Sequence, residues 1–167
     1  MRWIITGPES SGKTTLCKVL SQNFNLPVVD EYARDYIDTL DRNYTENDLI
    51  HIAQQQITEW NCHRTLETFF DTDLLTTIIW YQDKFNKIPS FMMDHWLKQK
   101  NGIYLLCVPD IDWTFDPQRE NPEDRDRIFR IYFHLLNAYG KPFKIIAGTG
   151  TARNDHAIQF IRRFKSY

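Results

Sequence analysis

Short apolar runs alternate along this chain with longer stretches in which apolar residues recur at helical spacing. The runs of strand length are residues 3–6, 27–30, 68–71, 102–108 and 143–147. Because a helix-length segment separates each run from the next, the pattern predicts an α/β fold with a parallel sheet. We therefore expect three layers, in which five parallel strands are flanked by helices.

The segments between these runs predict the helices. Helical spacing is found in residues 13–23, 31–40, 45–60, 74–79 and 154–164. Thr45 and Asp48 form a capping-box-like pair, which favours a helix start at residue 45. Residues 109–127 are dense in Asp, Glu and Arg, and we predict that they form an exposed lid segment. Since no linker or repeat interrupts the pattern, we expect a single domain over residues 1–167.

Composition and charge exclude several classes of protein. The chain is 42% hydrophobic and 25% charged, as is typical of a globular domain. Its apolar runs are too short to span a membrane, and the N-terminal run ends too early for a secretory signal. With 20 basic and 22 acidic residues, and three cysteines without a C-x-x-C pair, nothing indicates nucleic-acid binding, zinc or redox chemistry. We expect a cytoplasmic protein that binds no membrane; the sequence leaves its oligomeric state open.

The loop after the first strand carries the strongest chemical signal. Residues 7–14 match the phosphate-binding pattern G-x-x-x-x-G-K-[ST] in full, between an apolar strand and an amphipathic helix. Backbone N–H groups and the helix N-terminus bind phosphate in such a loop, the lysine reaches the β- and γ-phosphates, and the hydroxyl binds Mg²⁺. The motif predicts a P-loop NTPase fold that uses ATP and Mg²⁺. Its predicted nucleotide-binding residues are Gly7, Pro8, Glu9, Ser10, Ser11, Gly12, Lys13, Thr14 and Thr15.

Two charged residues follow the second strand, where ligands bind in open α/β sheets. Glu31 and Arg34 are three residues apart and share one face of the predicted helix. Glu31 could accept the proton of an attacking hydroxyl, and Arg34 could hold a polar substrate. The alternative is a surface ion pair with little energetic effect.

Two carboxylates follow the third strand. Asp71 ends the apolar run 68–71, which is how a carboxylate reaches Mg²⁺ beside a P-loop, so we predict Asp71 and Thr14 as metal ligands. Asp73 is a candidate substrate ligand and is equally suited to cap the helix that starts at Leu74. Glu31 is the leading candidate for the general base, with Asp71 and Asp73 as alternatives.

The predicted lid offers cations for the transferred phosphate. Arg119 and Arg125 could neutralise the charge that develops during phosphoryl transfer, although the segment could equally be a solvated loop and helix start. Trp113 could stack on a base or simply pack against its neighbours. The final turn, residues 147–153, could frame the adenine of a nucleotide, which makes Gly150 and Arg153 candidate nucleotide contacts.

With these residues assembled, the chain resembles the ribosylnicotinamide kinase domain of NadR-type NAD-biosynthesis proteins. The resemblance is carried by residues 7–16, 31–36, 71–77 and 113–119 and by the helix containing Arg153. It implies a nucleoside kinase-like P-loop fold. It also implies transfer of the ATP γ-phosphate to the 5′-hydroxyl of a small-molecule nucleoside, nicotinamide riboside, giving nicotinamide mononucleotide.

Alternative functions stay open at this point. Members of that family carry a nucleotidyltransferase domain ahead of the kinase; here the P-loop begins at Gly7 and no H-x-G-H signature is found, so we expect no adenylyltransferase activity. Another nucleoside or nucleotide kinase is the nearest alternative, followed by a nucleotide-binding regulatory ATPase without an acceptor. A GTPase is disfavoured, because Asn86-Lys87-Ile88-Pro89 is not an N-K-x-D guanine motif.

Overall fold

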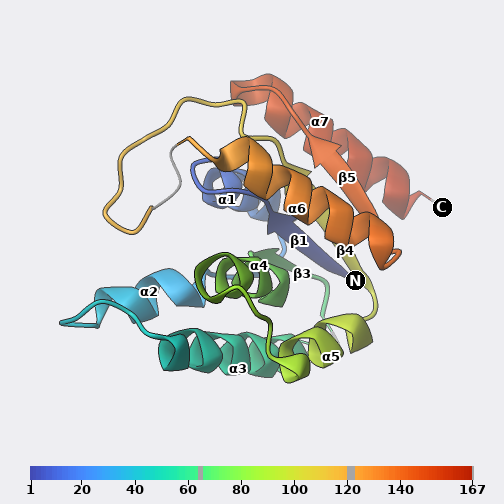
Figure 1. The fold of residues 1–167 in the computed structure, drawn as a ribbon. Helices are drawn as coiled ribbons and strands as arrows, with labels where there is room; N and C mark the ends of the chain where they lie inside the picture. The colour runs from blue at the N-terminus through green and yellow to red at the C-terminus, as the bar shows by residue number, and fades with distance from the viewer. Residues whose placement is uncertain (64–65, 120–122, 167) are drawn as a thin grey trace.

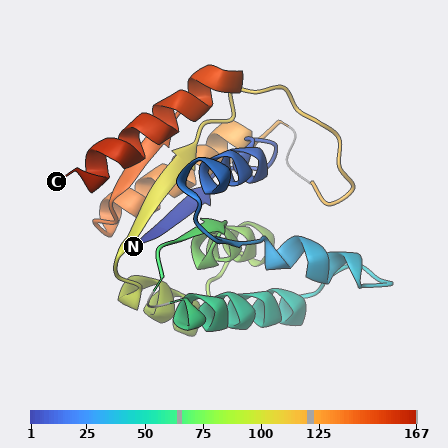
Figure 2. The same cartoon turned by 180° about the vertical axis from the view of Figure 1, so that it is seen from behind.

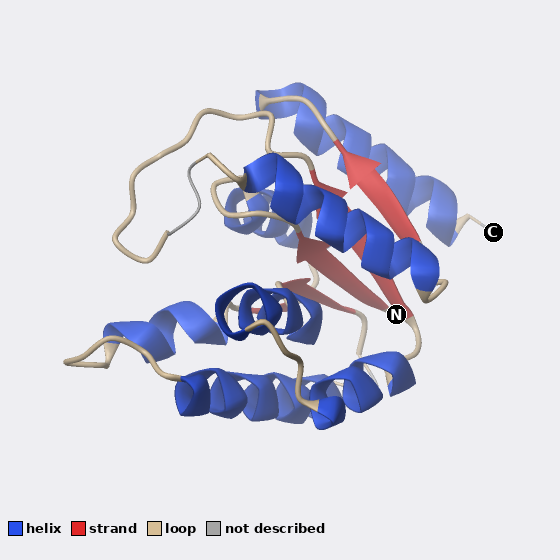
Figure 3. Ribbon diagram, in the orientation of Figure 1, coloured by secondary structure: helices blue, strands red, loops and turns tan. Residues whose placement is uncertain are grey.

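Five parallel strands form the centre of the protein. The computed structural model describes residues 1–63, 66–119 and 123–166. Its sheet has the order β2-β3-β1-β4-β5, and every neighbouring pair is parallel. The strands are β1 (Arg2–Thr6), β2 (Val28–Val29), β3 (Thr68–Asp71), β4 (Gly102–Cys107) and β5 (Phe143–Ile146). The predicted five-stranded parallel sheet is therefore confirmed, and β1 lies at its centre (Figure 3).

Helices cover both faces of this sheet. The helices are α1 (Lys13–Phe24), α2 (Tyr32–Asp38), α3 (Glu46–Cys62), α4 (Leu74–Phe85), α5 (Ser90–Lys98), α6 (Arg125–Ala138) and α7 (Gly150–Lys165). Figure 1 looks onto α4 and α6, and Figure 2 looks from behind onto α1 and α7. Successive side chains of β1 point to opposite faces of the sheet, and all of them are apolar from Trp3 to Ile5. Trp3 and Ile5 pack with α1 and α7, whereas Ile4 packs with α3 to α6, so both faces of the sheet are hydrophobic.

Strand order explains why a site forms at one edge of the sheet. The chain passes from β1 to β2 on one side, and from β3 to β4 it crosses β1 to the other side. In open α/β sheets, ligands bind where the connections diverge in this way, beyond the carboxyl ends of the strands. The P-loop follows β1 at this position. Asp71 pairs with Ile5 in the register between β3 and β1, which brings it to the same edge.

The structure differs from the sequence prediction at three places. The helices α5 and α6 were not among the predicted helices, and the charged 109–127 segment ends in the first turn of α6, which starts at Arg125. The helix α7 begins at Gly150, four residues before the predicted start, so Gly150 and Arg153 are helical and the final turn is shorter. Residues 120–122 of the predicted lid lie outside the described residues. Within the described ranges, no helix is both long enough and apolar enough to cross a membrane.

Candidate active site

The P-loop, residues 7–14, forms a compact turn between β1 and α1. Gly7 has a φ of +137°, and a Cβ atom there would lie 2.6 Å from the carbonyl oxygen of Cys107, so only glycine fits. The Ser11 hydroxyl donates to the Pro8 carbonyl at 2.7 Å, and the Lys13 ammonium donates to the same carbonyl at 2.8 Å. The N-terminus of α1 therefore faces the loop with Lys13 folded across it, as an anion site requires.

Arg153 supports this loop from behind. Its guanidinium donates to the carbonyl oxygens of Ser11 at 2.7 Å, Gly148 at 2.8 Å and Val108 at 3.1 Å, and it forms an ion pair with Asp110 at 2.7 Å. Only 4% of Arg153 is exposed. The side chain thus joins α7 and the end of β4 to the main chain of the P-loop.

Glu31 and Arg34 lie at the start of α2, beside Lys13. Glu31 is the N-cap residue of α2, and its carboxylate pairs with the Arg34 guanidinium at 3.8 Å. Burial raises the pKa of the Glu31 carboxyl above its usual range, although the nearby Lys13 ammonium acts in the opposite direction. A carboxyl with a raised pKa beside a phosphate-binding lysine has the properties of a general base.

Asp71 lies at the carboxyl end of β3 and is almost fully buried. Burial raises the pKa of its carboxyl, and this effect is opposed by the Thr14 hydroxyl and the Lys13 ammonium. One oxygen, Oδ1, is buried and has no hydrogen-bond partner. The next residue, Thr72, has a φ of +74°, which is a strained conformation for a β-branched residue. This strained residue stands between Asp71 and Asp73 in the chain.

The unpartnered oxygen of Asp71 is suited to bind Mg²⁺. A buried carboxylate oxygen without a partner, close to a threonine hydroxyl, is the oxygen donor set that Mg²⁺ prefers. Among the described residues, no group of three or more His, Cys, Asp or Glu side chains could hold a metal ion. The residues therefore fit a Mg²⁺ that takes its other ligands from substrate phosphates and water, as is usual for this ion.

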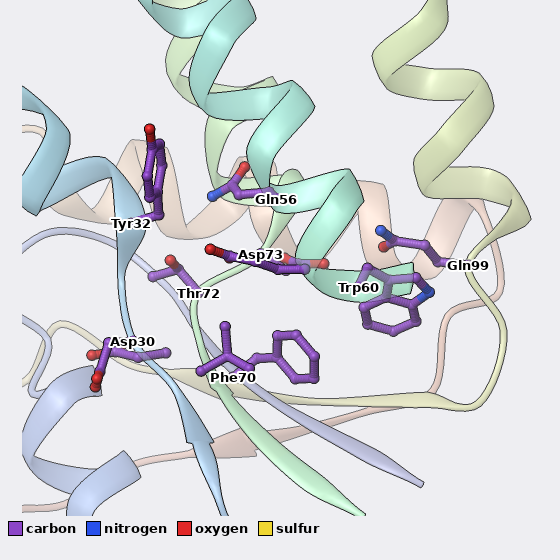
Figure 4. A pocket seen from close by; sticks show the side chains of 11 residues that line it. Asp30, Tyr32, Gln56, Trp60, Phe70, Thr72, Asp73 and Gln99 are labelled. Carbon is purple, nitrogen blue, oxygen red and sulfur yellow. The ribbon is translucent and has the colours of Figure 1, made fainter. Parts of the chain in front are cut away.

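Asp73 has a different environment from Asp71. It caps α4, where its carboxylate accepts from the Leu75 amide at 3.2 Å, and it also accepts from the Tyr104 hydroxyl at 2.8 Å. The predicted capping role is thus confirmed. Burial raises the pKa of Asp73 to about 6. Its side chain lines a cavity of only about 10 Å³, together with Gln56 and Gln99 (Figure 4).

The lid segment contacts both α2 and the P-loop. Asp116 pairs with Arg34 at 2.8 Å, and the Gln118 amide donates to the Arg34 carbonyl at 3.3 Å. Arg119 pairs with Asp116 at 3.7 Å and reaches the Ser10 hydroxyl at 3.5 Å. The described part of the lid therefore contacts α2 on one side and the P-loop on the other.

Arg125 and Trp113 also take part in the contact between the lid segment and the P-loop. Arg125 is the first residue of α6, and it donates to the carbonyl oxygens of Ser10 at 3.2 Å and Ile111 at 2.9 Å. The Trp113 ring lies 5.7 Å from the Arg125 guanidinium and 5.9 Å from that of Arg119. The structure thus brings both predicted arginines to the P-loop. It places Trp113 against their guanidinium groups, a cation–π arrangement.

One cavity of about 360 Å³ joins these groups. The sequence-predicted residues in its walls are the nine of the P-loop region (residues 7–15), Glu31, Arg34, Arg119 and Arg125. Asp71, Asp73, Trp113, Gly150 and Arg153 lie outside its walls. The volume falls in the range of ~300–1,000 Å³ that is usual for small-molecule sites.

A second part of the cavity wall was missed by sequence reasoning. It is formed by side chains of the loop between α2 and α3, of α4 and of α6, among them Arg42, Tyr44, Thr76, Trp80, Asp83 and Tyr132. A signal was present, because Thr76, Trp80 and Asp83 are spaced at i, i+4 and i+7. They therefore share one face of α4, and two of the three are polar.

The chain is similar in sequence to known proteins. The family model described as AAA domain matches residues 2–153. The trifunctional NAD biosynthesis/regulator protein NadR of Salmonella typhimurium is 27% identical over 133 residues, which cover 74% of this chain and 32% of that protein. The chain thus spans about a third of the length of this curated relative.

Solved structures show the same fold. The structure of a NadR protein in complex with NAD and AMP-PNP has a TM-score of 0.79 and 22% identity, covering 97% of this chain and 48% of that one. A second NadR structure, in complex with NR, has a TM-score of 0.78 and 21% identity, covering 99% and 52%. These similarities confirm the resemblance predicted from the sequence and the P-loop fold.

Proposed function

The chain belongs to the AAA domain family, and from this premise we propose that it is an ATP-dependent kinase acting on nicotinamide riboside. In the proposed reaction, the γ-phosphate of ATP passes to the 5′-hydroxyl of the riboside, giving nicotinamide mononucleotide and ADP. The similarity to NadR, one structure of which is a complex with NR, supports this acceptor. The observation that carries the proposal is the shared cavity, whose walls contain the P-loop, Glu31 and the aromatic side chains of Tyr44 and Trp80.

The P-loop end of the cavity would bind the triphosphate. Its backbone N–H groups and the N-terminus of α1 offer a preorganised anion site, and Lys13 lies across it. Thr14 and Asp71 would hold Mg²⁺, which neutralises charge on the phosphates when it is bound. Arg119 and Arg125 contact Ser10 of the P-loop, and in the proposed reaction they would supply two further cations to the transferred phosphate.

Glu31 is the proposed general base. As the 5′-oxygen forms its bond to the γ-phosphorus, the bond from that phosphorus to the β–γ bridging oxygen breaks and ADP leaves. The hydroxyl proton passes to the Glu31 carboxylate, whose pKa is raised by burial. Lys13 and Arg34 both lie near Glu31 and would orient the reactants, so catalysis would depend on positioning and charge rather than on a covalent intermediate.

The charges near α2 and the loop after it, where the acceptor would bind, favour a nucleoside over a nucleoside monophosphate. Arg34 is paired with Glu31 and Asp116, and Arg42 is paired with Asp48 at 2.7 Å. Both cavity arginines on this side are therefore neutralised by carboxylates of the protein. An acceptor that already carried a phosphate would have to displace one of these ion pairs.

ADP release in the presence of ATP and Mg²⁺ tests the proposal. The acceptors would be nicotinamide riboside, the common nucleosides, their monophosphates and a control without acceptor. We expect strong release with nicotinamide riboside alone. Strong release with a different nucleoside or a monophosphate would keep the kinase and overturn its substrate. Equal release with every acceptor and with none would overturn the kinase assignment in favour of a regulatory ATPase.

A further inference from the structure

Part of the cavity wall is an aromatic pair built from two elements. Trp80 comes from α4 and Tyr44 from the loop between α2 and α3, and both side chains are partly buried. Their ring centroids lie 4.8 Å apart with an interplanar angle of 68°. The indole N–H of Trp80 donates to the Tyr44 hydroxyl at 3.1 Å. The two rings thus form a fixed edge-to-face pair.

This hydrogen bond determines what Trp80 can offer a ligand. The indole has one hydrogen-bond donor, and Tyr44 already accepts from it. What Trp80 presents to the cavity is therefore its apolar ring. Ile79 of α4 and Ile128 of α6 add apolar surface to the same cavity, whereas Thr76 and Asp83 add polar groups on the face of α4 that carries Trp80. Trp80 itself therefore offers a planar ring contact through its indole face and no free hydrogen-bond donor.

The loop that carries Tyr44 is held by one buried carboxylate. Asp48 accepts two hydrogen bonds from Arg42 at 2.7 and 3.0 Å, one from the Thr45 amide at 2.6 Å and one from the Tyr36 hydroxyl at 2.8 Å. These donors come from α2, from the loop and from the start of α3. Asp48 therefore joins all three segments and fixes the position of Tyr44 against Trp80.

We infer that Trp80, oriented by Tyr44, is the specificity-determining residue that contacts the base of the acceptor. The inference rests on the proposed function, since it assigns the acceptor's ring to the part of the cavity wall that Trp80 and Tyr44 form. Glu31 and the P-loop then face the ribose 5′-hydroxyl. The Trp80 ring acts in binding and takes no part in the transfer of the phosphoryl group.

The test separates binding of the ring from chemistry. Steady-state ADP release would be measured for the wild type and the variants Trp80→Leu, Trp80→Phe and Tyr44→Phe, with nicotinamide riboside and ATP varied in turn. Base–aromatic stacking contributes enough that we expect Trp80→Leu to raise the acceptor KM roughly tenfold, with kcat changed less than about threefold. Trp80→Phe keeps a ring and should retain most of the affinity. Tyr44→Phe removes the oxygen that orients the indole and should raise KM about two- to fivefold.

Controls keep this outcome distinct from failure of the proposed function. Phe164→Leu, an exposed aromatic substitution on α7, should leave both constants unchanged, and circular dichroism would verify that each variant is folded. If the wild type is active and a folded Trp80→Leu variant keeps the wild-type acceptor KM, the inference is overturned and the kinase assignment stands. A rise in the ATP KM of Trp80→Leu equal to that of the acceptor would overturn it too. If the wild type releases no ADP with any acceptor, the proposed function itself has failed.

Discussion

Arg153 donates a 2.7 Å hydrogen bond to the carbonyl oxygen of Ser11, which lies 142 residues earlier in the chain. The contact joins α7 to the middle of the P-loop from the side away from the cavity. The same guanidinium pairs with Asp110, so one buried cation connects the phosphate loop with the end of β4. The shape of the P-loop therefore depends on a helix that is distant in sequence.

The substitution Arg153→Ala should both destabilise the protein and weaken ATP binding. It removes the Arg153 hydrogen bond to the Ser11 carbonyl and the ion pair with Asp110. Because the Asp110 side chain is partly exposed and still accepts from the Gly148 amide, we expect a loss of ~1–3 kcal/mol. Arg153→Lys should recover only part of this, because an ammonium cannot reproduce the planar fork of donors. Urea unfolding and equilibrium ATP binding would measure the two effects, with the exposed Arg163→Ala as control. An unchanged ATP affinity in folded Arg153→Ala would contradict a supporting role for the P-loop.

Lys13→Ala should reduce turnover at least ~10³-fold, because the residue supplies charge at the phosphate site. Its ammonium bonds a loop carbonyl at 2.8 Å and lies outside both hydrophobic clusters, so the fold should be preserved. Lys18→Ala, an exposed lysine on the same helix, is the matched control. ADP release and thermal unfolding are the measurements. Near-wild-type turnover in Lys13→Ala would contradict the assignment of residues 7–14 as the phosphate-binding loop.

Glu31→Gln should lower kcat by roughly 10²–10⁴-fold while ATP still binds, as expected for loss of a general base. Because burial raises the pKa of Glu31 and the base must be ionised, the acidic limb of the wild-type pH profile should lie above the usual carboxyl range. The limb should be absent from the residual activity of the variant. Asp35→Asn, exposed on the same helix, is the control. A retained acidic limb in Glu31→Gln that disappears in Asp71→Asn would assign the base to Asp71 instead.

The buried Asp73 predicts a pH dependence of stability. Its folded-state pKa of about 6 exceeds the ordinary value of ~3.9, so the folded protein holds this proton more tightly than the unfolded chain. The stabilisation is present below about pH 4 and is lost as the pH rises through about 6, a change of about 3 kcal/mol. Asn resembles the protonated acid and also caps helices, so Asp73→Asn should lack this decline.

Urea unfolding between pH 4 and 8 would measure that difference. The wild type should lose stability relative to Asp73→Asn as the pH rises, and Asp94→Asn, on the exposed side of α5, should behave as the wild type does. Parallel curves for the wild type and Asp73→Asn would show that Asp73 is ionised in the folded protein across this range.

Asp116→Asn should loosen the lid with little effect on global stability. The Arg34 guanidinium holds the pKa of Asp116 below its usual range, so this ion pair persists down to acidic pH and is lost as the pH falls further. The pair is partly exposed, which limits its contribution to ~0–1 kcal/mol. We expect faster proteolysis of the lid and a higher acceptor KM, and neither change in Asp112→Asn, which is exposed in the same segment. Equal proteolysis rates in both variants would argue against a role of the Asp116–Arg34 ion pair in holding the lid.

Local patterns in the sequence were sufficient for the sheet and for the chemistry at its edge. Alternation of apolar runs predicted all five strands, and the spacing of Gly7, Gly12 and Lys13 predicted the phosphate loop. Thr45 and Asp73 were predicted as helix N-caps, because a cap depends only on the residues beside it. These signals act over a few residues, so they can be read without knowing how distant segments pack.

The partners of each side chain were decided by the tertiary structure alone. Trp80 and Trp113 are both tryptophans outside the strands, yet packing puts Trp80 in the wall of the cavity and Trp113 against two arginines. Arg153 was predicted as a nucleotide contact, and the structure places it behind the loop, buried among carbonyl groups. Such environments depend on contacts between residues tens of positions or more apart. The sequence of each segment fixes its local conformation, but only the folded chain determines which segments meet.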